Sequence, residues 1–295
     1  MSRRSRNVQL VKTGQEHRRE LAKLMREASY SHAVWQIWDD LMYFVAAALA
    51  QPMKWVQARE DEYLRRIGHY DKKTIDLFTQ MFAEIVLAFE QEGFVDVLGD
   101  MYMQLELFNR WKGQYFTPSH ICDFMAKITD NNLSELVEKQ GYISVNDPCC
   151  GGGAMLMAFA KNAQEQGIHY QRDVLYVGQD IDPVVARMCY ISMSLLGLGG
   201  YVIIGNSLTH PPTEPMTADY EIWFTPMYFV HGFQWRWQRN EPIHADGGVT
   251  PAQDEETGAH DSTPEAAEIV PQPTQAPPAP DVEYKETKVG QLTLF

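Results

Sequence analysis

Residues 144–156, Ser-Val-Asn-Asp-Pro-Cys-Cys-Gly-Gly-Gly-Ala-Met-Leu, are the stretch that most constrains the fold. An apolar run ends in Asp-Pro, three glycines follow, and a helix-forming segment begins, which predicts a strand, a tight turn and a helix N-terminus. The glycines allow positive φ and a close approach of a ligand to the backbone. The first amides of the helix attract a carboxylate or phosphate. Glycine clusters are usually plain turns, so the specific signal is the Asp-Pro-x-Cys-Gly-x-Gly spacing.

The chain on either side of this turn alternates between strands and helices. Short apolar runs that end in polar residues predict strands, and longer segments between them predict helices. This order indicates an α/β protein with a doubly wound, mostly parallel sheet, in which ligands lie beyond the carboxyl ends of the strands. Four strands are expected at 143–146, 174–178, 201–204 and 221–224, with helices at 154–166 and 183–196.

Polar residues follow these strands and suggest the kind of ligand. Asp180, after the second strand, suits a ribose diol, because a carboxylate accepts two hydroxyl hydrogen bonds. Asn206, after the third, can bond an adenine edge, and Asp147, after the first, can hold an ammonium group. No Gly-Lys-Ser/Thr phosphate loop is present. The pattern favours an adenosine cofactor with a charged amino-acid end over a nucleotide phosphate.

The N-terminal part has a different pattern. Residues 1–12 predict a basic arm, and residues 13–110 predict a helical domain with one-sided apolar stripes. Trp35, Trp38 and Trp55 are expected in its core rather than in a ligand site. The α/β domain is placed at 111–240. Its last residues, 233–239, alternate apolar and polar side chains and predict an edge strand, with aromatic stacking on nucleic acid as the other interpretation.

The C-terminal part is acidic and rich in proline. Residues 241–288 predict a disordered linker, and residues 289–295 form an apolar tip. Residues 241–295 carry a net charge of −9 out of −14, so the body is only −5 and overall charge does not exclude DNA binding. Four cysteines without metal or disulfide spacing, and no signal or membrane-spanning segment, predict a cytoplasmic protein without a metal site.

Several motifs together resemble the N6-adenine DNA methyltransferases, and specifically the modification subunits of type I restriction systems. The resemblance covers about residues 70–230 and implies a Rossmann-like methyltransferase sheet, apparently truncated after its fourth strand, behind a helical N-terminal domain. The motifs that carry it are Gly-Gln-Tyr-Phe-Thr-Pro at 113–118, Asp-Pro-Cys-Cys-Gly-Gly-Gly at 147–153, Gly-Gln-Asp at 178–180, Gly-Asn-Ser at 205–207, and the leading segment 96–102.

This resemblance implies S-adenosylmethionine as the cofactor. Thr117 and its neighbours would hold the methionine part. Asp147 and the glycine turn, Gly151 to Gly153, would contact the methionine amino end and let the cofactor lie close to the backbone. Asp180 would hold the ribose, and Asn206 would face the adenine, where the family usually has aspartate.

The catalytic motif departs from the family. The family ends its fourth strand with Asn/Asp-Pro-Pro-Tyr/Phe, which binds the target amine and stacks on the flipped base. This chain has Thr225, Pro226, Met227 and Tyr228 there. Tyr228 can still stack, but Thr225 offers only a hydroxyl. Losing one such acceptor costs on the order of 2–4 kcal/mol of transition-state stabilisation, and the family's later strands and sequence-reading region are not visible.

The last five residues resemble the peptide by which bacterial proteins bind the replication sliding clamp. The pattern is Gln-Leu-x-Leu-Phe, carried by Gln291, Leu292, Leu294 and Phe295. Its place at the end of a linker is what such a tethered motif needs. The other interpretation is that Leu294 and Phe295 dock on the body of the protein.

Two functions follow from these features. The first is an orphan, phage- or plasmid-like DNA adenine-N6 methyltransferase that uses S-adenosylmethionine and is tethered to the clamp, with DNA as substrate. The second is a catalytically impaired relative that acts as a binding or decoy protein on DNA, the clamp or a restriction complex. A further subunit that completes the sheet or reads sequence is a possible partner in either case, and methylation of another target stays open.

Overall fold

The computed structural model describes residues 12–107, 116–129, 133–209, 211, 221–233 and 291–293. All of these lie in one compact unit formed by Met1–Pro242 and Gly290–Phe295. The predicted basic arm, apart from Lys12, and the predicted linker lie outside the described residues. No described helix is long and apolar enough to cross a membrane.

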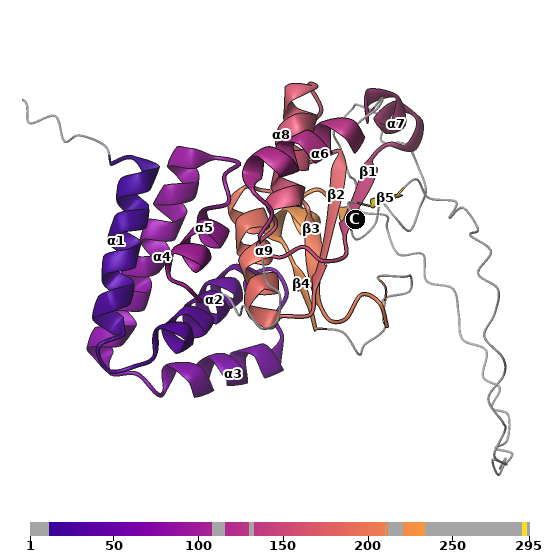
Figure 1. The fold of residues 1–295 in the computed structure, drawn as a ribbon. Coiled ribbons are helices and arrows are strands. Elements are labelled where there is room, and N and C mark those ends of the chain that lie inside the picture. The colour runs from indigo at the N-terminus through magenta and orange to yellow at the C-terminus, as the bar shows by residue number, and fades with distance from the viewer. Residues whose placement is uncertain are drawn as a thin grey trace, which may run out of the picture. The chain divides into compact units, whose positions relative to one another are not determined.

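The N-terminal half is helical, as its apolar periodicity predicts. Side-chain caps explain where helices begin: Thr13 and Glu16 form a capping box, and Asp71 and Asp96 each accept a hydrogen bond from the amide three residues later. The helices of this half, drawn in indigo to magenta in Figure 1, are α1 (Gly14–Ala28), α2 (Val34–Ala50), α3 (Gln57–Ile67), α4 (Lys72–Glu92) and α5 (Val97–Gln104).

Helix α2 is the core of this half, packing against α1, α3 and α4 and also against α9 (Pro183–Leu195) of the α/β part. Trp38 on α2 is 1% exposed, as expected for a core residue. The same expectation is wrong for Trp35 and Trp55, which are 66% and 60% exposed. Trp35 is the second residue of α2, at the very end of the helix, and Trp55 lies in the loop before α3, so both are outside the buried centre of the bundle.

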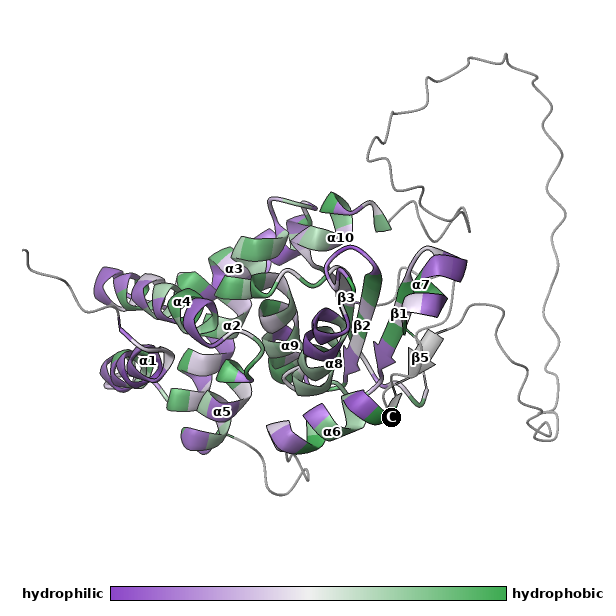
Figure 2. Cartoon of the chain, turned by 90° about the horizontal axis from the view of Figure 1, so that it is seen from above, coloured by the Kyte–Doolittle hydropathy of each residue, from purple (hydrophilic) through white to green (hydrophobic). Residues whose placement is uncertain are grey.

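The C-terminal half is an α/β sheet. Strands β1 (Ile143–Asp147), β2 (Val174–Asp180) and β3 (Gly200–Ile204) are parallel neighbours. Figure 2 shows β1 and β2 changing from hydrophobic to hydrophilic toward their carboxyl ends, where the predicted ligand residues lie. The remaining helices of this half are α6 (Ser119–Thr129), α7 (Leu133–Gln140), α8 (Ala154–Glu165), α9 and α10 (Pro226–Val230).

The fourth predicted strand lies in an unexpected place. β4 (Glu221–Phe224) pairs antiparallel with β3 at one edge of the sheet, whose order is β4-β3-β2-β1-β5. A parallel strand needs a crossover of a dozen or more residues, usually helical, whereas an antiparallel strand returns by a short connection. Sixteen residues separate Ile204 from Glu221, which is near the lower limit for a crossover, and the described ones, 205–209 and 211, include no helix. This connection is compatible with the antiparallel return that the structure shows.

The other edge of the sheet is formed by the chain's own tail. β5 (Gln291–Thr293) pairs parallel with β1, with Ser144 opposite Gln291 and Asn146 opposite Thr293. In the doubly wound order 3-2-1-4, the fourth strand lies beside the first, and here β5 takes that place. The predicted fifth strand at 233–239 lies outside the described residues, apart from Phe233, which is helical.

Trp38 and Trp35 give a direct test of the core. Trp38→Ala removes a fully buried ring that packs beside Tyr102 and should lower the free energy of unfolding by about 3–5 kcal/mol. Trp35→Ala, on the same helix but exposed, should change it by no more than about 0.5 kcal/mol. Urea denaturation followed by circular dichroism measures both. Equal effects would contradict the assignment of Trp38 to the core.

Candidate functional site

The glycine turn after β1 has the backbone conformation that the sequence predicts. Gly151 and Gly153 have φ of +51° and +92°, which side chains disfavour. The Cys150 amide donates to the Gln179 carbonyl at 2.9 Å, which joins the turn to β2. Gly153 begins α8 without a side-chain cap, so the first amides of that helix are available to a ligand.

Asp180 links the end of β2 to this turn. Its Oδ2 accepts a hydrogen bond from the Gly151 amide at 2.9 Å, and its Oδ1 accepts one from the Asp182 amide, also at 2.9 Å. Burial raises the pKa of Asp180 above its ordinary value. Both carboxylate oxygens are therefore held in place by the backbone and keep lone pairs for two further donors.

Asp147 lies at the carboxyl end of β1 and is only 4% exposed. Its Oδ1 accepts a hydrogen bond from the Cys149 amide at 3.1 Å. Burial raises the pKa of Asp147 to about 7, and the charge of Asp180 adds to this shift. A carboxylate in this setting is stabilised by a cation.

The ends of β1 and β3 also meet here. Cys149 Sγ lies 4.0 Å from Ser207 Oγ, which places the loop after β3 beside the glycine turn. Asn206, in that loop, is partly exposed, and its Oδ1 accepts a hydrogen bond from the Leu208 amide at 2.9 Å. The side-chain oxygen of Asn206 thus orders its own loop, while its amide nitrogen can still donate.

The segment before α6 covers the turn from the helical side. The Phe116 ring lies 3.1 Å from where a Cβ on Gly151 would be, and it packs edge-on to Tyr102 with ring centres 5.6 Å apart. Thr117 is exposed, and its carbonyl accepts a contact from Cys122 Sγ at 3.6 Å. Residues 113–115 of this motif lie outside the described part of the chain. Phe116 is a site residue that the sequence analysis did not single out.

The predicted catalytic residues lie elsewhere. Because β4 is antiparallel, Thr225 follows its end at the amino end of β3, roughly 13 Å along the sheet from the Asp180 edge at about 3.3 Å per residue. Thr225 is fully buried: its Oγ1 accepts from the Gly200 amide at 2.9 Å and donates to the Leu198 carbonyl at 2.7 Å. The motif therefore lies at the opposite end of β3 from the Asp180 edge.

Pro226 and Tyr228 follow Thr225 away from that edge. Pro226 begins α10, and Tyr228 is 5% exposed in an aromatic cluster with Phe224 and Phe233. A ring packed in this way cannot stack on a flipped base without leaving the cluster. In this structure, Pro226 starts a helix and Tyr228 packs in the core, so both have a structural role.

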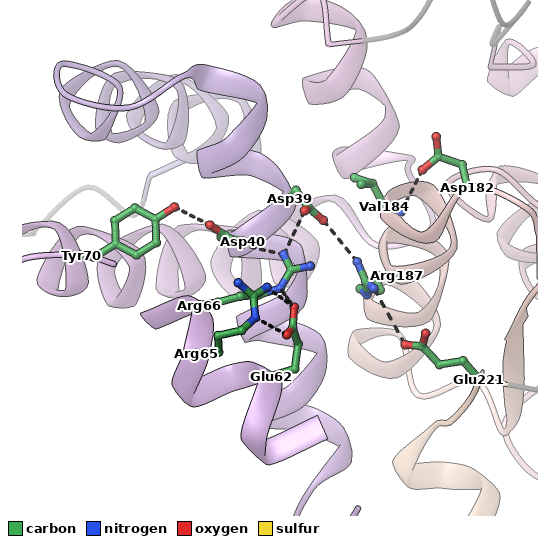
Figure 3. A network of polar contacts seen from close by, with 10 residues as sticks. All are labelled: Asp39, Asp40, Glu62, Arg65, Arg66, Tyr70, Asp182, Val184, Arg187 and Glu221. Atoms are coloured by element: carbon green, nitrogen blue, oxygen red, sulfur yellow. Dashed lines mark hydrogen bonds and ion pairs between the residues drawn. The ribbon is translucent and has the colours of Figure 1, made fainter. Parts of the chain in front are cut away.

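Figure 3 shows a polar network that fixes α9, the helix that begins directly after the Asp180 loop. Arg66 of α3 contacts Asp40 and Asp39 of α2 at 2.6 and 2.9 Å, and Arg187 of α9 contacts Asp39 at 3.2 Å. About one turn before Arg187, Asp182 caps the N-terminus of α9 by accepting from the Val184 amide at 2.9 Å. The helical half thereby positions one wall of the site, which the sequence pattern did not reveal.

Two further features complete the inventory of this edge. Ile181 follows Asp180 and is 67% exposed, which leaves an apolar side chain free to cover a flat ring. Within the residues described, no group of three or more histidine, cysteine, aspartate or glutamate side chains could hold a metal ion.

Three parallel strands with a glycine turn after β1 and a carboxylate after β2 define a Rossmann-like α/β fold. The sequence profile described as N-6 DNA Methylase matches residues 94–258, which is more than half of the chain. The chain belongs to this family.

Individual relatives point the same way. A type I restriction enzyme methylase subunit, MjaIX, from Methanocaldococcus jannaschii is 26% identical over 132 residues, or 43% of this chain. The match spans only 22% of that subunit's length.

Solved structures are more distant. A type I restriction-modification methyltransferase subunit from Streptococcus thermophilus matches at 14% identity and TM-score 0.38, covering 69% of this chain and 61% of the other. A protein assigned to the class I S-adenosylmethionine-dependent methyltransferases from Listeria monocytogenes matches at 17% and 0.37, covering 68% and 57%.

The raised pKa of Asp147 predicts a pH-dependent stability. A carboxyl group with a folded pKa of about 7 and an ordinary unfolded value near 4 binds more protons in the folded state, so the stability that it contributes is lost as pH rises toward and through 7. Asp147→Asn keeps the acceptor for the Cys149 amide but cannot ionise. Without ligand, its melting temperature should exceed that of the wild type by several degrees at pH 8 and match it at pH 4.5.

The matched control is Asp76→Asn, which removes one exposed charge from α4. Its melting temperature should follow that of the wild type at both pH values. A stabilisation by Asp147→Asn that is independent of pH would show that the Asp147 carboxyl is not a buried, titrating group.

Proposed function

We propose that this protein binds S-adenosylmethionine at the carboxyl edge of the sheet and serves DNA adenine-N6 methylation. The observation that carries the proposal is the Asp180 carboxylate, held by the Gly151 amide between the glycine turn and the end of β2. Membership in the N-6 DNA methylase family supplies the reaction class. When bound, S-adenosylmethionine supplies an electrophilic methyl group.

The residues present fit such a ligand. Asp180 would accept hydrogen bonds from the ribose hydroxyls, and Asn206 and Ile181 would meet the adenine edge and face. Asp147, buried and stabilised by a cation, would hold the ammonium group, and Thr117 would lie toward the methionine part. Each of these groups lies on the elements around the glycine turn.

The methylation step itself needs more than the described residues place at this edge. Thr225 and Tyr228 are buried in the fold at the other end of β3. Acceptors for the target amine would then come from a second subunit or from a rearranged β4. We therefore propose that the chain methylates DNA together with a partner. Its relative is named as one subunit of a type I restriction enzyme, which agrees with this proposal.

The burial of Thr225 also favours a second candidate function. A chain that keeps the cofactor edge but uses its catalytic motif for packing would act as a non-catalytic binding or decoy protein on DNA or on a restriction complex. Cofactor binding is common to both functions, whereas N6-methyladenine production belongs only to the first.

Asp180→Ala tests the cofactor edge. It removes the two bonds to the Gly151 and Asp182 amides as well as the ribose acceptor. Hydrogen bonds to a charged group contribute about 1.5–3 kcal/mol each, so affinity for S-adenosylmethionine should fall about 100-fold or more in calorimetry. Asp76→Ala, an exposed aspartate on α4, is the control and should bind normally. Unchanged binding by Asp180→Ala would refute the assignment of the cofactor site to this edge of the sheet.

The reaction is tested in a bacterial host without DNA methylation. N6-methyladenine in its DNA, measured by mass spectrometry above the Asp180→Ala control, would support the methyltransferase. A folded, cofactor-binding chain that gives no signal, alone or with a type I partner subunit, would favour the non-catalytic function.

The C-terminal tail has a proposed partner of its own, the sliding clamp. Gln291 and Leu292 lie in β5 on the edge of β1, while Leu294 and Phe295 lie outside the described residues. The pairing of β5 with β1 supports the docked interpretation of the tail. The same residues cannot occupy the sheet edge and a clamp pocket together, so clamp binding would require β5 to leave β1.

Deleting residues 291–295 tests both interpretations of the tail. If β5 covers β1, amide exchange at Ser144 and Asn146, whose amides face β5, should become at least about tenfold faster, since an edge strand exposes its backbone groups. If the tail binds the clamp, the deletion should abolish capture by immobilised clamp. Thr293→Ser, at the variable position of the motif, is the control and should change neither. Unchanged exchange would contradict the β5 pairing, and unchanged capture would contradict the clamp.

A further inference from the structure

Asp96 brings a carboxylate from the helical half of the protein to the glycine turn. It is the N-cap of α5, and its Oδ1 accepts a hydrogen bond from the Gly99 amide at 2.8 Å. A Cβ on Gly152 would lie 3.3 Å from Asp96 Oδ1 and 3.5 Å from Oδ2. The missing side chain at position 152 is what lets this carboxylate lie against the turn.

The surroundings of Asp96 are short of positive charge. Arg18 is the cation that acts on it, but Arg18 is engaged by Glu92 and by Asp100, whose carboxylate lies 2.7 Å from Arg18 Nη1. The charge of Asp100 opposes ionisation of Asp96. In the part of the chain that is described, no lysine, arginine or histidine forms an ion pair with Asp96.

Three carboxylates therefore surround one turn. Asp147 and Asp180 reach it from the ends of β1 and β2, and Asp96 reaches it from α5. Burial raises the pKa of Asp96 to about 6, and it raises the pKa values of the other two as well. Such a cluster is costly when it is ionised and empty, and a bound cation offsets that cost.

We propose that Asp96 is a cofactor-binding residue, which places its carboxylate beside the positively charged methionine end of S-adenosylmethionine. The inference rests on the proposed function and adds a contact from outside the sheet. It also gives the helical half a direct part in the site. The contact with Gly152 places the Asp96 carboxylate at the glycine turn, where the carboxylates of Asp147 and Asp180 also lie.

Capping α5 is the purely structural role that Asp96 could have instead. Asparagine and serine cap helices about as well as aspartate, whereas they carry no charge. Asp96→Asn and Asp96→Ser therefore separate the two roles. Asp71 provides a matched control, because it caps α4 through an equivalent 2.8 Å bond from the Thr74 amide, in the first turn of that helix.

The test measures affinity by calorimetry for S-adenosylmethionine, which carries a sulfonium and an ammonium, and for S-adenosylhomocysteine, which carries the ammonium alone. Asp96→Asn and Asp96→Ser should weaken S-adenosylmethionine binding about tenfold or more without lowering the melting temperature of the ligand-free protein. Weakening of both ligands would place Asp96 by the ammonium, and weakening of S-adenosylmethionine alone would place it by the sulfonium. Asp71→Asn should leave both affinities unchanged.

The inference is overturned if the folded Asp96→Asn and Asp96→Ser variants bind both ligands as the wild type does. It is also overturned if affinity falls only in proportion to a loss of melting temperature, since that is the behaviour of a cap. A wild-type protein that binds neither ligand would instead refute the proposed function, so the two failures are distinguishable.

Discussion

The hydrogen bond from the Gly151 amide to Asp180 is the contact on which the rest of the site depends. It closes the turn after β1 onto the end of β2, which requires the left-handed conformation at Gly151 and sets the start of α8 beside it. The same closure places Gly152 against the Asp96 carboxylate. Without this bond, the strand ends would still be adjacent, but the amides and carboxylates would not converge on one place.

Negative charge is the second organising feature. Asp96, Asp147 and Asp180 have raised pKa values because each is wholly or partly removed from water at the turn, and proteins keep such clusters where a cation binds or where function requires the strain. The cations of the neighbouring helices are committed elsewhere: Arg66 and Arg187 neutralise Asp39 and Asp40 and hold α9 against α2. The helical half thus holds α9 in place, while the negative charge of the three carboxylates at the turn is left without a paired cation from the described helices.

The order and direction of the strands separate the proposed cofactor edge from the predicted catalytic motif at residues 225–228. β4 returns antiparallel beside β3, so Thr225 is used to bond the start of β3, and the place beside β1 goes to the tail. The proposed methylation needs the cofactor and the acceptors for the target amine at the same edge. This arrangement therefore makes a partner, or a rearrangement of the sheet, the central question for activity, and it gives the last residues of the chain a structural role at the site's border.

The sequence by itself determined the local elements and the residues that follow them. The glycine turn, Asp147, Asp180 and the caps at Thr13 and Asp71 depend on short-range geometry, which neighbouring residues specify. Strand partners depend on packing between distant segments, and only the tertiary structure decided that β4 turns back and that residues 291–293 pair with β1. The contact between Asp96 and the turn is of the same kind, because 55 residues separate Asp96 from Gly152 and no local pattern encodes their meeting.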